Sequence, residues 1–369
     1  MALFLPSLRG GGVERVFVQL ARGLADLDSR VDLVTSTHGG RYLDEIDRRV
    51  RLIDLGFRHV SGALPGLVRY LRQEKPDAVV SAMTHANSLA IAARFLAGSP
   101  ARVIVSEHHF FSREKNRGFL NKERLVMALA GWLYPRADAI TAVSQGVADD
   151  LSQSLRLPGE RVHTIYNPID IERIRALSEA PPEHPWFAPG EPPVILSAGR
   201  FTWEKDYPTL IQAFRKVHAE RPARLVILGE GPDRLALEAL IASLGLTAVV
   251  ALPGFVANPY SFMRRCGAFA LSSVTEGLPV ALVEALACGA RVVATNCPSG
   301  PAEILENGTY GRLVPVGDSD GMAAALLHAL AQPADRQAGI QRAADFSLEK
   351  ISRQYLDLIR SLPGMRAGE

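Results

Sequence analysis

Two glutamates that stand eight residues apart, Glu276 and Glu284, are the side chains in this sequence best placed to do chemistry. They flank a Gly-Leu-Pro turn in the stretch SSVTEGLPVALVEALACGARVVAT. The preceding run 268–272 is short and apolar, as in a buried strand, and Pro279 has the fixed φ that suits the first position of a helix. The pattern predicts a strand, a loop and a helix over 280–288, with both carboxylates near the helix N-terminus.

The start of that helix is a predicted anion site. A helix N-terminus carries unpaired backbone N–H groups and the positive end of the helix dipole, and here both face the loop that holds Glu276, Gly277 and Leu278. A phosphate fits such a site, and two nearby carboxylates can accept hydrogen bonds from vicinal hydroxyls. We therefore expect a ligand that combines a phosphate with a sugar or a ribose.

The stretch EGLPVALVE, followed by EALACGARVVAT and the turn SGPAEIL, resembles the E-x₇-E signature of family-four retaining glycosyltransferases, which have the GT-B fold. The resemblance implies that Glu284 binds the ribose of the nucleotide. It also implies that Glu276 lies beside the hydroxyls of the donor sugar and helps to stabilise charge at the anomeric carbon. The backbone N–H groups of Gly277 and Leu278 would then donate to sugar or phosphate.

Two cations follow the strand predicted at 194–198. Gly199 and Arg200 come directly after it, and Lys205 follows five residues later in GRFTWEKDYPTL, which resembles the G-R-x₄-K pattern of the same family. The resemblance implies that Arg200 and Lys205 hold the donor diphosphate and neutralise the leaving group, a task that other transferases give to a metal. Ordinary surface ion pairing is the alternative for both.

Two Asp-x-Asp triplets could bind a metal in a transferase of another fold. Asp26 and Asp28 stand at the end of a predicted helix, and Asp318 and Asp320 precede the helix predicted at 322–330 as a cap. We therefore predict no metal site. We also predict no cofactor, since the nucleotide diphosphate sugar is a co-substrate.

Two further turns in the second half of the chain are candidates for donor binding. The strand predicted at 225–228 ends at Gly229 and Gly231, which let the backbone approach a ligand closely. Phe255 and Val256 follow the strand predicted at 249–252 and resemble the family segment that packs on the nucleotide base.

A glycine run near the start of the chain has the geometry of a phosphate loop. The strand predicted at 2–5 is followed by Gly10, Gly11 and Gly12 and then by helical spacing over 13–24. A dinucleotide fingerprint would need a glycine where Arg15 stands, so a nicotinamide cofactor is disfavoured. By the resemblance we place Gly11 and Gly12 close to donor phosphate and acceptor, and a tight turn without a ligand is the alternative.

His108 follows the strand predicted at 102–106, at an edge where parallel sheets bind ligands. It resembles the active-site histidine of the family, which contacts the donor sugar. A loop histidine satisfied by its neighbours is the alternative. His85 comes after another predicted strand and is a less specific candidate.

The segment 110–124, FFSREKNRGFLNKER, mixes aromatic and basic residues and leads into the apolar run LVMALAGWLY. Such a segment suits a membrane surface or a lipid-linked pyrophosphate, and a solvated helix packed on the domain explains it almost as well. The basic side chains that would form this membrane or acceptor surface are Arg113, Lys115, Arg117, Lys122 and Arg124.

The order of the predicted elements indicates an α/β protein. Strands alternate with helices through both halves of the chain, which implies two Rossmann-like domains with doubly wound parallel sheets, facing across a cleft in the GT-B fold. We expect an acceptor-binding domain at 1–168 and a nucleotide-sugar-binding domain at 169–346. By the resemblance, the helical segment 347–369 returns to the first domain.

The composition excludes several classes of protein. The chain has 369 residues with 47% apolar and 22% charged content, which is ordinary for a globular protein of two domains, and a net charge of +2 is too weak for a nucleic-acid binder. Its three cysteines form no C-x-x-C pair, so neither a disulfide framework nor a zinc site is indicated. The first residues lack the pattern of a secretory signal, so we expect a cytoplasmic protein. If the protein docks on a membrane, we expect it at the inner face of the cytoplasmic membrane.

The motifs occur in the order of the family, so we interpret the chain as a metal-independent retaining glycosyltransferase. It would move a hexose or N-acetylhexosamine from a nucleotide diphosphate sugar, with UDP as the expected nucleotide, to a saccharide acceptor. Bacterial transferases that extend lipid-linked or surface saccharides are its nearest resemblance, so a lipid-linked acceptor is expected. A nucleotide-sugar epimerase of the same fold and a non-catalytic nucleotide-sugar-binding protein remain alternatives.

Overall fold

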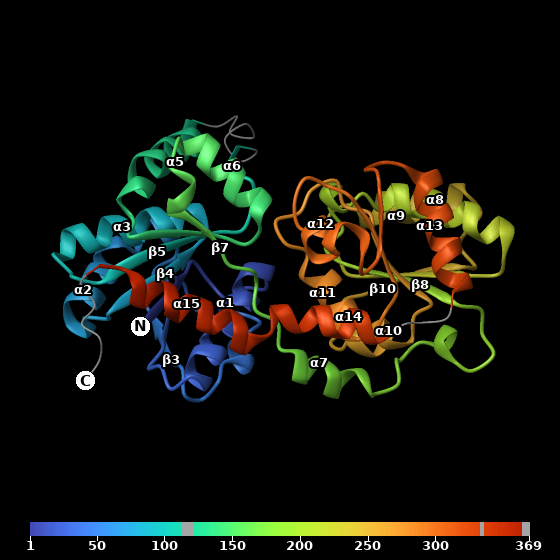
Figure 1. Cartoon of the computed structure of the whole chain (residues 1–369), viewed down its shortest axis with the longest axis horizontal. Helices are drawn as coiled ribbons and strands as arrows, with labels where there is room; N and C mark the ends of the chain where they lie inside the picture. Colours follow the sequence, from blue (N-terminus) through green and yellow to red (C-terminus); the bar gives the residue numbers. More distant parts are fainter. Residues whose placement is uncertain (113–120, 333–335, 364–369) are drawn as a thin grey trace. The chain divides into compact units, whose positions relative to one another are not determined.

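The structure is a computed structural model that describes residues 1–112, 121–332 and 336–363; the side chains of 121–124 are outside the description. The chain forms two compact units (Figure 1). The first consists of Met1–Ile169 together with Ser347–Glu369, and the second is Asp170–Phe346. For comparison, the boundaries expected from the sequence are 168/169 and 346/347.

The first unit is built on a seven-stranded sheet in the order β3-β2-β1-β4-β5-β6-β7. All of its strands pair in parallel, and the inner ones are buried on both faces, which is why they read as continuous apolar runs. The strands are β1 (Ala2–Leu5), β2 (Asp32–Thr35), β3 (Arg51–Asp54), β4 (Ala78–Ala82), β5 (Arg102–Glu107), β6 (Ala139–Ala142) and β7 (Val162–Thr164).

Helices cover this sheet and connect its strands. In chain order they are α1 (Gly12–Asp26), α2 (Leu64–Glu74), α3 (Thr84–Ala97), α5 (Asn121–Leu133) and α6 (Gln145–Leu155). The last helix, α15 (Leu348–Ser361), packs on α1, and its buried face carries Ile351, Ser352, Tyr355, Leu358 and Ile359. The end of the chain therefore completes the first unit.

The second unit holds a six-stranded parallel sheet in the order β10-β9-β8-β11-β12-β13. Its strands are β8 (Val194–Ala198), β9 (Arg224–Leu228), β10 (Val250–Gly254), β11 (Ala268–Leu271), β12 (Val292–Thr295) and β13 (Arg312–Val314). Its helices are α7 (Ile171–Ser178), α8 (Tyr207–Glu220), α9 (Arg234–Ser243), α10 (Tyr260–Arg265), α11 (Val280–Ala287), α12 (Pro301–Ile304), α13 (Ser319–Ala331) and α14 (Arg336–Ala343).

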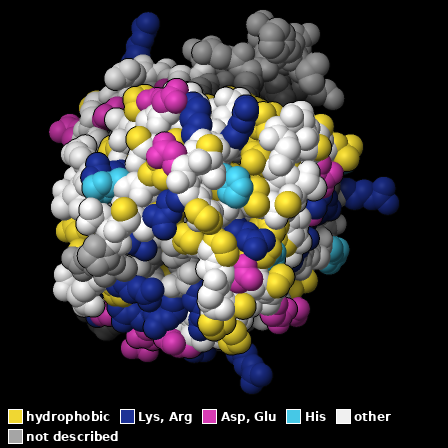
Figure 2. All heavy atoms as spheres, turned by 90° about the vertical axis from the view of Figure 1, so that its right-hand side faces the viewer, with side chains coloured by type: hydrophobic (Ala, Val, Ile, Leu, Met, Phe, Trp, Pro, Cys, Tyr) yellow, Lys and Arg dark blue, Asp and Glu magenta, His cyan; other side chains and the backbone are white. Residues whose placement is uncertain are grey.

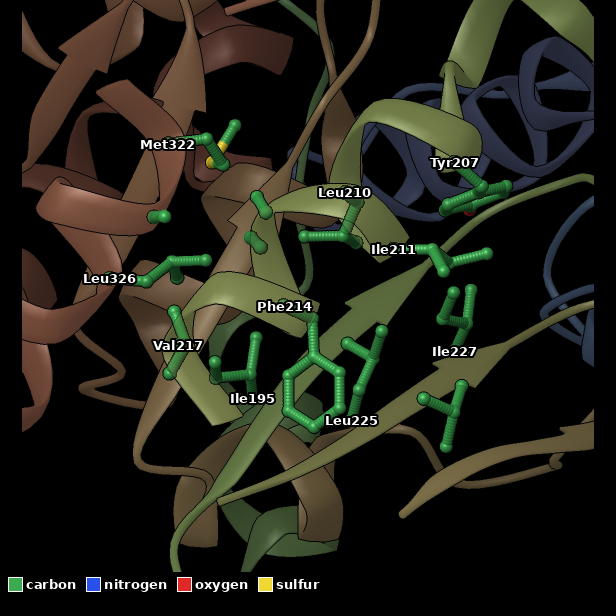
Figure 3. Packing of buried hydrophobic residues seen from close by; sticks show 14 of the residues in the cluster. Ile195, Tyr207, Leu210, Ile211, Phe214, Val217, Leu225, Ile227, Met322 and Leu326 are labelled. Carbon is green, nitrogen blue, oxygen red and sulfur yellow. The ribbon is translucent and has the colours of Figure 1, made fainter. Parts of the chain in front are cut away.

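The core on one side of this second sheet shows how the unit is held together. Phe214 and Val217 of α8 pack with Leu326 of α13 against Ile195 and other strand residues, all of them nearly inaccessible to solvent (Figure 3). Burying apolar surface in this way contributes roughly 25 cal/mol per Å². The core therefore fixes β8 and its neighbours, whose ends carry the predicted donor site.

Both sheets are doubly wound, which confirms the predicted fold class. In the first sheet, successive strands are added on one side of β1 up to β3 and then on its other side from β4 onward, so the switch point lies between β1 and β4. In the second sheet, the switch point lies between β8 and β11 for the same reason. Ligands of such sheets bind beyond the carboxyl ends of the strands at this switch point.

Local details differ from the sequence-based expectation in two places. Pro279 is the N-cap of α11 and does not form its first helical residue. Helix α3 begins at Thr84, so His85, expected only to follow a strand, is an exposed residue of the first helical turn. Among the described residues, no helix has both the length and the apolar character needed to cross a membrane.

Candidate functional site

The switch point of the second sheet brings the predicted cations and the first glutamate together. Strands β8 and β11 are neighbours in parallel register, so the loops that follow them, 199–206 and 272–279, leave the same edge. Two hydrogen bonds join these loops: Ser272 Oγ donates to the carbonyl of Lys205 at 2.7 Å, and Val274 N donates to the carbonyl of Glu204 at 2.8 Å.

Glu276 and Lys205 form an ion pair at this edge. The Nζ–Oε1 distance is 2.6 Å, and both side chains are largely shielded, with 12% of Glu276 and 22% of Lys205 exposed. Ser273 Oγ donates to the same oxygen at 2.6 Å. Within the described part of the chain, Oε2 accepts no hydrogen bond, so the carboxylate is held by one oxygen and can offer the other to a hydroxyl.

Arg200 differs from Lys205 in its surroundings. It is exposed, and its guanidinium makes no hydrogen bond or ion pair with any residue that the structure describes. Its charge is therefore available to an anion in solution, whereas the charge of Lys205 is already shared with Glu276.

Glu284 lies in α11 and is 5% exposed. The hydroxyl of Tyr260, from α10, donates to its Oε1 at 2.9 Å in a buried bond. A carboxylate buried with a fixed donor has a defined orientation, which suits recognition of a particular pair of hydroxyls.

The loop between Glu276 and α11 is braced by the turn at 299–301. Ser299 Oγ donates to the carbonyl of Gly277 at 2.9 Å. Gly300 has a φ of +89°, and a Cβ there would lie 2.5 Å from Pro279 Cδ, so only glycine fits. The N–H groups of Gly277 and Leu278 donate to none of the described residues, which leaves them as the donors expected from the sequence.

The glycines at the ends of β8 and β9 are explained by contacts within the protein. A Cβ at Gly229 would lie 1.9 Å from the carbonyl oxygen of Gly199, and one at Gly231 would lie 2.3 Å from that of Phe201. The close approach that requires glycine is thus between two loops, and a ligand is not needed to account for it. At the end of β10, Phe255 is 65% exposed and Val256 is half-buried.

In the first unit, the glycine loop follows β1 at the switch point. Gly11 is the N-cap of α1 and Gly12 its first residue. The buried carboxylate of Glu14 accepts from Gly11 N–H and, at 2.8 Å, from Ser7 Oγ. Glu14 thus already supplies an acceptor at the place where the sequence predicted a phosphate cradle.

His108 follows β5 and is 7% exposed. Burial, with a smaller contribution from the charge of His109, lowers the pKa of His108 to about 3. The ring is therefore neutral at physiological pH and acts as a hydrogen-bonding group. Its Nε2 lies 3.2 Å from Ser106 Oγ, and its ring lies 6.0 Å from that of Phe17 in α1.

The predicted basic surface falls largely on residues outside the described part of the chain. Arg113, Lys115 and Arg117 lie outside the described residues, and for Lys122 and Arg124 only their place in α5 is described.

The two aspartate triplets have structural roles. Asp318 Oδ1 caps α13 by accepting from Gly321 N at 2.8 Å, and Asp320 pairs with Lys216 at 2.6 Å. Asp26 is the last residue of α1, and Asp28 follows it with a φ of +58°. Among the described residues, no three His, Cys, Asp or Glu side chains form a group that could hold a metal ion.

The three cysteines are buried free thiols, as expected for core residues. Burial raises the pKa of Cys297 to about 11 and also raises the pKa values of Cys266 and Cys288. None of them is a reactive thiolate at neutral pH.

The second unit also has an open depression of about 840 Å³ between β13 and α13, at the edge of the sheet. Its lining includes Arg312 and His328, which are hydrogen-bonded to each other at 2.6 Å, and none of the predicted site residues. The chemistry-bearing side chains therefore lie at the switch point and not in this depression.

Solved structures share the fold over almost the whole chain. HepE of Anabaena, determined in complex with UDP, covers 98% of this chain and 100% of its own, with a TM-score of 0.79 at 22% identity. The lipopolysaccharide outer core galactosyltransferase WaaB covers 98% of each chain with a TM-score of 0.73 at 18% identity. These likenesses confirm the GT-B fold.

Sequence comparison identifies the family. Residues 10–173 match the model described as Glycosyltransferase Family 4, and residues 183–346 match that described as Glycosyl transferases group 1. The lipopolysaccharide core biosynthesis glycosyltransferase LpsE of Rhizobium meliloti is 27% identical over 96% of this chain and 97% of its own.

A relative from Campylobacter jejuni is 30% identical over 96% of this chain and 98% of its own. It is the N-acetylgalactosamine-N,N'-diacetylbacillosaminyl-diphospho-undecaprenol 4-alpha-N-acetylgalactosaminyltransferase. With the fold, the ion pair at the switch point and both family matches in agreement, this chain belongs to the family-four glycosyltransferases.

Proposed function

We propose that this chain is a retaining, metal-independent glycosyltransferase that moves a hexose or N-acetylhexosamine from a UDP-sugar to a saccharide carried on a lipid diphosphate. The observation that carries the proposal is the full-length match to the Campylobacter jejuni relative, whose name specifies N-acetylgalactosamine and a diphospho-undecaprenol acceptor. The UDP complexes of HepE support the choice of nucleotide.

Different residues of the second unit are proposed to bind the ribose, the sugar and the diphosphate of the donor. Glu284, fixed by Tyr260, binds the ribose, and the open oxygen of Glu276 accepts from a sugar hydroxyl. Arg200, Lys205 and the free N–H groups of Gly277 and Leu278 face the diphosphate, whose negative charge grows as the bond to the anomeric carbon breaks.

The transfer step needs no side-chain nucleophile. The acceptor oxygen forms its bond to the anomeric carbon on the face that the diphosphate leaves, and a phosphate oxygen takes the proton of the acceptor hydroxyl. His108, neutral because it is buried, contributes a hydrogen bond to the transferred sugar and no proton transfer.

Labelled UDP-N-acetylgalactosamine and an undecaprenyl-diphosphate-linked saccharide test the proposal, with the same saccharide without lipid as a control. We expect UDP release together with a longer, alpha-linked product. Epimerised sugar nucleotide without acceptor consumption would identify an epimerase, and binding without either reaction would identify a non-catalytic protein.

A lipid-linked acceptor also requires the protein to reach a membrane, and α5 offers a surface for this. Leu125, Leu129 and Trp132 are spaced to lie on one face of the helix and are 69%, 45% and 58% exposed. The guanidinium of Arg136 lies 3.9 Å from the centre of the Trp132 ring. Apolar and aromatic side chains beside a cation are typical of surfaces that dock on anionic lipid.

The end of α3 extends this surface. Phe95 and Leu96 are more than half exposed, and Arg94 lies over the Phe95 ring at 4.9 Å. Arg94 also donates to the carbonyl of Arg136 at 2.9 Å, which joins the two helix ends. We include this α3–α5 surface in the proposal as the contact with an anionic lipid bilayer.

Vesicle flotation checks the membrane contact. Trp132→Glu should reduce binding to vesicles that contain phosphatidylglycerol, whereas Leu235→Glu, at a 78% exposed position of the second unit, should not. Equal binding by the two variants would exclude the α3–α5 surface. On the face of the second unit turned toward the viewer in Figure 2, charged side chains of both signs are interspersed.

A further inference from the structure

Strand β10 carries a bulge just before the turn at 255–257. Ala251 pairs with Val226 and Gly254 pairs with Leu228, so three residue steps of β10 face two residue steps of β9. A bulge interrupts the ladder of backbone hydrogen bonds and redirects the strand, and bulges are frequent beside active sites. The course of the chain into the turn therefore depends on the contacts that stabilise this bulge.

Arg234, the first residue of α9, supplies such a contact from the neighbouring loop. Its Nη2 donates to the carbonyl of Leu252 at 2.8 Å, and its Nη1 donates to Glu230 Oε1 at 2.9 Å. Its Nε lies 2.9 Å from Glu238 Oε1. A guanidinium can only donate, and its N–H groups form a rigid planar fork. Arg234 therefore holds the loop after β9 and the bulge of β10 in one geometry.

The last residue of β10 is fixed from the same side. Gly254 has a φ of +88°, and a Cβ there would lie 2.8 Å from Glu230 Oε1, the oxygen that Arg234 holds. The carbonyl of Gly254 accepts from Gly229 N at 2.9 Å. The loop after β9 thus sets the point from which Phe255 and the turn begin.

The turn at 255–257 presents groups that suit a nucleobase. The ring of Phe255 is more than half exposed, and the backbone N–H and C=O of Val256 make no hydrogen bond with any residue that the structure describes. An aromatic ring can stack on a base, and a free peptide can pair with the donors and acceptors at a base edge. The chain then continues to Tyr260, whose hydroxyl holds Glu284, the proposed ribose partner.

We propose that Arg234 is a positioning residue for recognition of the nucleobase: its bond to the Leu252 carbonyl fixes the bulge and so places the turn at 255–257 for the base of the donor. The contact with a base rests on the proposed function. The bonds of Arg234 themselves lie within the second unit. Among the described residues, Arg234 makes no hydrogen bond to the loop 199–206, so its effect should be confined to the base and should spare the diphosphate.

Arg234→Lys tests this role, because it keeps the positive charge and removes the planar fork. Dissociation constants for UDP, CDP, ADP and GDP are measured by calorimetry, with displacement of UDP for the weaker ligands. We expect the affinity for UDP to fall about 3- to 10-fold, which is the worth of one hydrogen bond, and the affinities for the other three to stay nearly unchanged. The preference for UDP should therefore shrink by the same factor.

Glu238→Gln is the matched control. Glu238 contacts the same guanidinium from one turn further along α9 and does not contact the bulge, so this variant should keep the wild-type preference. In turnover assays, Arg234→Lys should raise KM for the UDP-sugar and leave kcat at saturating donor unchanged, because the groups proposed to act on the sugar and the diphosphate are intact.

A wild-type preference among the four nucleotides in Arg234→Lys would refute the positioning role, and so would an equal loss of affinity for all four. Failure of the proposed function looks different. In that case the wild type would prefer another nucleotide or transfer no sugar, while Arg234→Lys would still weaken binding of whichever nucleotide the wild type prefers.

Discussion

Removing the ammonium group of Lys205 separates two roles of this side chain, as the partner of Glu276 and as a cation for the leaving diphosphate. Lys205→Met keeps the apolar stem and leaves Ser273 as the one donor to the Glu276 side chain among the described residues. Hydrogen bonds to charged groups contribute about 1.5 to 3 kcal/mol, and partial exposure of both partners lowers the stability cost to about 1 to 2 kcal/mol.

The effect on turnover should exceed this stability cost. The diphosphate gains charge as the glycosidic bond breaks, and loss of one preorganised donor to such a charge typically costs about 10²- to 10³-fold in kcat. The assay is release of UDP at saturating donor and acceptor, at a temperature where the variant is fully folded. Because the side chains of methionine and lysine have similar volumes, a lower kcat in Lys205→Met can be attributed to the lost charge.

Glu276→Gln and the double variant complete the comparison. If Lys205 acts on the diphosphate and Glu276 on the sugar, their effects on kcat should nearly add, while their effects on unfolding free energy should not, because the ion pair is lost only once. Wild-type kcat in Lys205→Met at saturating donor would refute the leaving-group role. Strongly non-additive kcat values would mean that the pair acts only as a structural clamp.

Four other outcomes are expected. Glu284→Ala should weaken UDP binding by about 1.5 to 3 kcal/mol in calorimetry, and unchanged affinity would rule out the ribose contact. Gly12→Ala should leave the free energy of unfolding unchanged, since no described atom lies within 4 Å of the added Cβ, and should lower activity if a ligand approaches this loop. Gly159→Ala is the control, because the space around its Cβ position is also free within 4 Å. Activity should survive EDTA, and loss restored by Mn²⁺ would contradict metal independence. Finally, the pH profile of kcat should show no titration of His108 near pH 6.5. The free energy of unfolding should decrease as the pH falls below 6.5, because the unfolded ring binds a proton there and the folded ring, with its lowered pKa, does not. The same pH dependence of the unfolding free energy in His108→Gln would refute this.

The sequence predicted the helices, strands and caps, which depend on neighbouring residues. It did not predict the side-chain bonds between residues that are far apart in the sequence. The alternation of apolar runs with helical spacing predicts both sheets, and the Asp318 cap follows from residue type and position alone. The Lys205–Glu276 bond joins residues 71 positions apart, and the Tyr260–Glu284 bond joins residues 24 positions apart. Neither leaves a local signal, so the sequence named three of these residues without pairing them and missed Tyr260 entirely.

At the glycine loop near the start of the chain, the sequence-based reasoning left out one residue. The prediction of a phosphate cradle considered the glycines and the helix N-terminus, but not the carboxylate three residues further along. Glu14 folds back to accept from Gly11 N–H, the geometry of a capping box, and the signal for it was present in the sequence. Because a buried carboxylate already stands at this N-terminus, a phosphate there would meet repulsion, and a hydroxyl-bearing ligand would not.

The ion pair also changes the electrostatic argument about metal. Arg200, Lys205 and the N-terminus of α11 together supply about two and a half positive charges, which is comparable to a divalent ion plus the helix dipole. Glu276 removes one of these charges while the donor is absent, so about one and a half remain, mostly from Arg200 and the helix. An ammonium group has three donors, however, and only one is used by Glu276. Lys205 can therefore bind the diphosphate without leaving Glu276, and its charge beside this carboxylate disfavours a divalent ion there, which is the physical reason for proposing a metal-independent transfer.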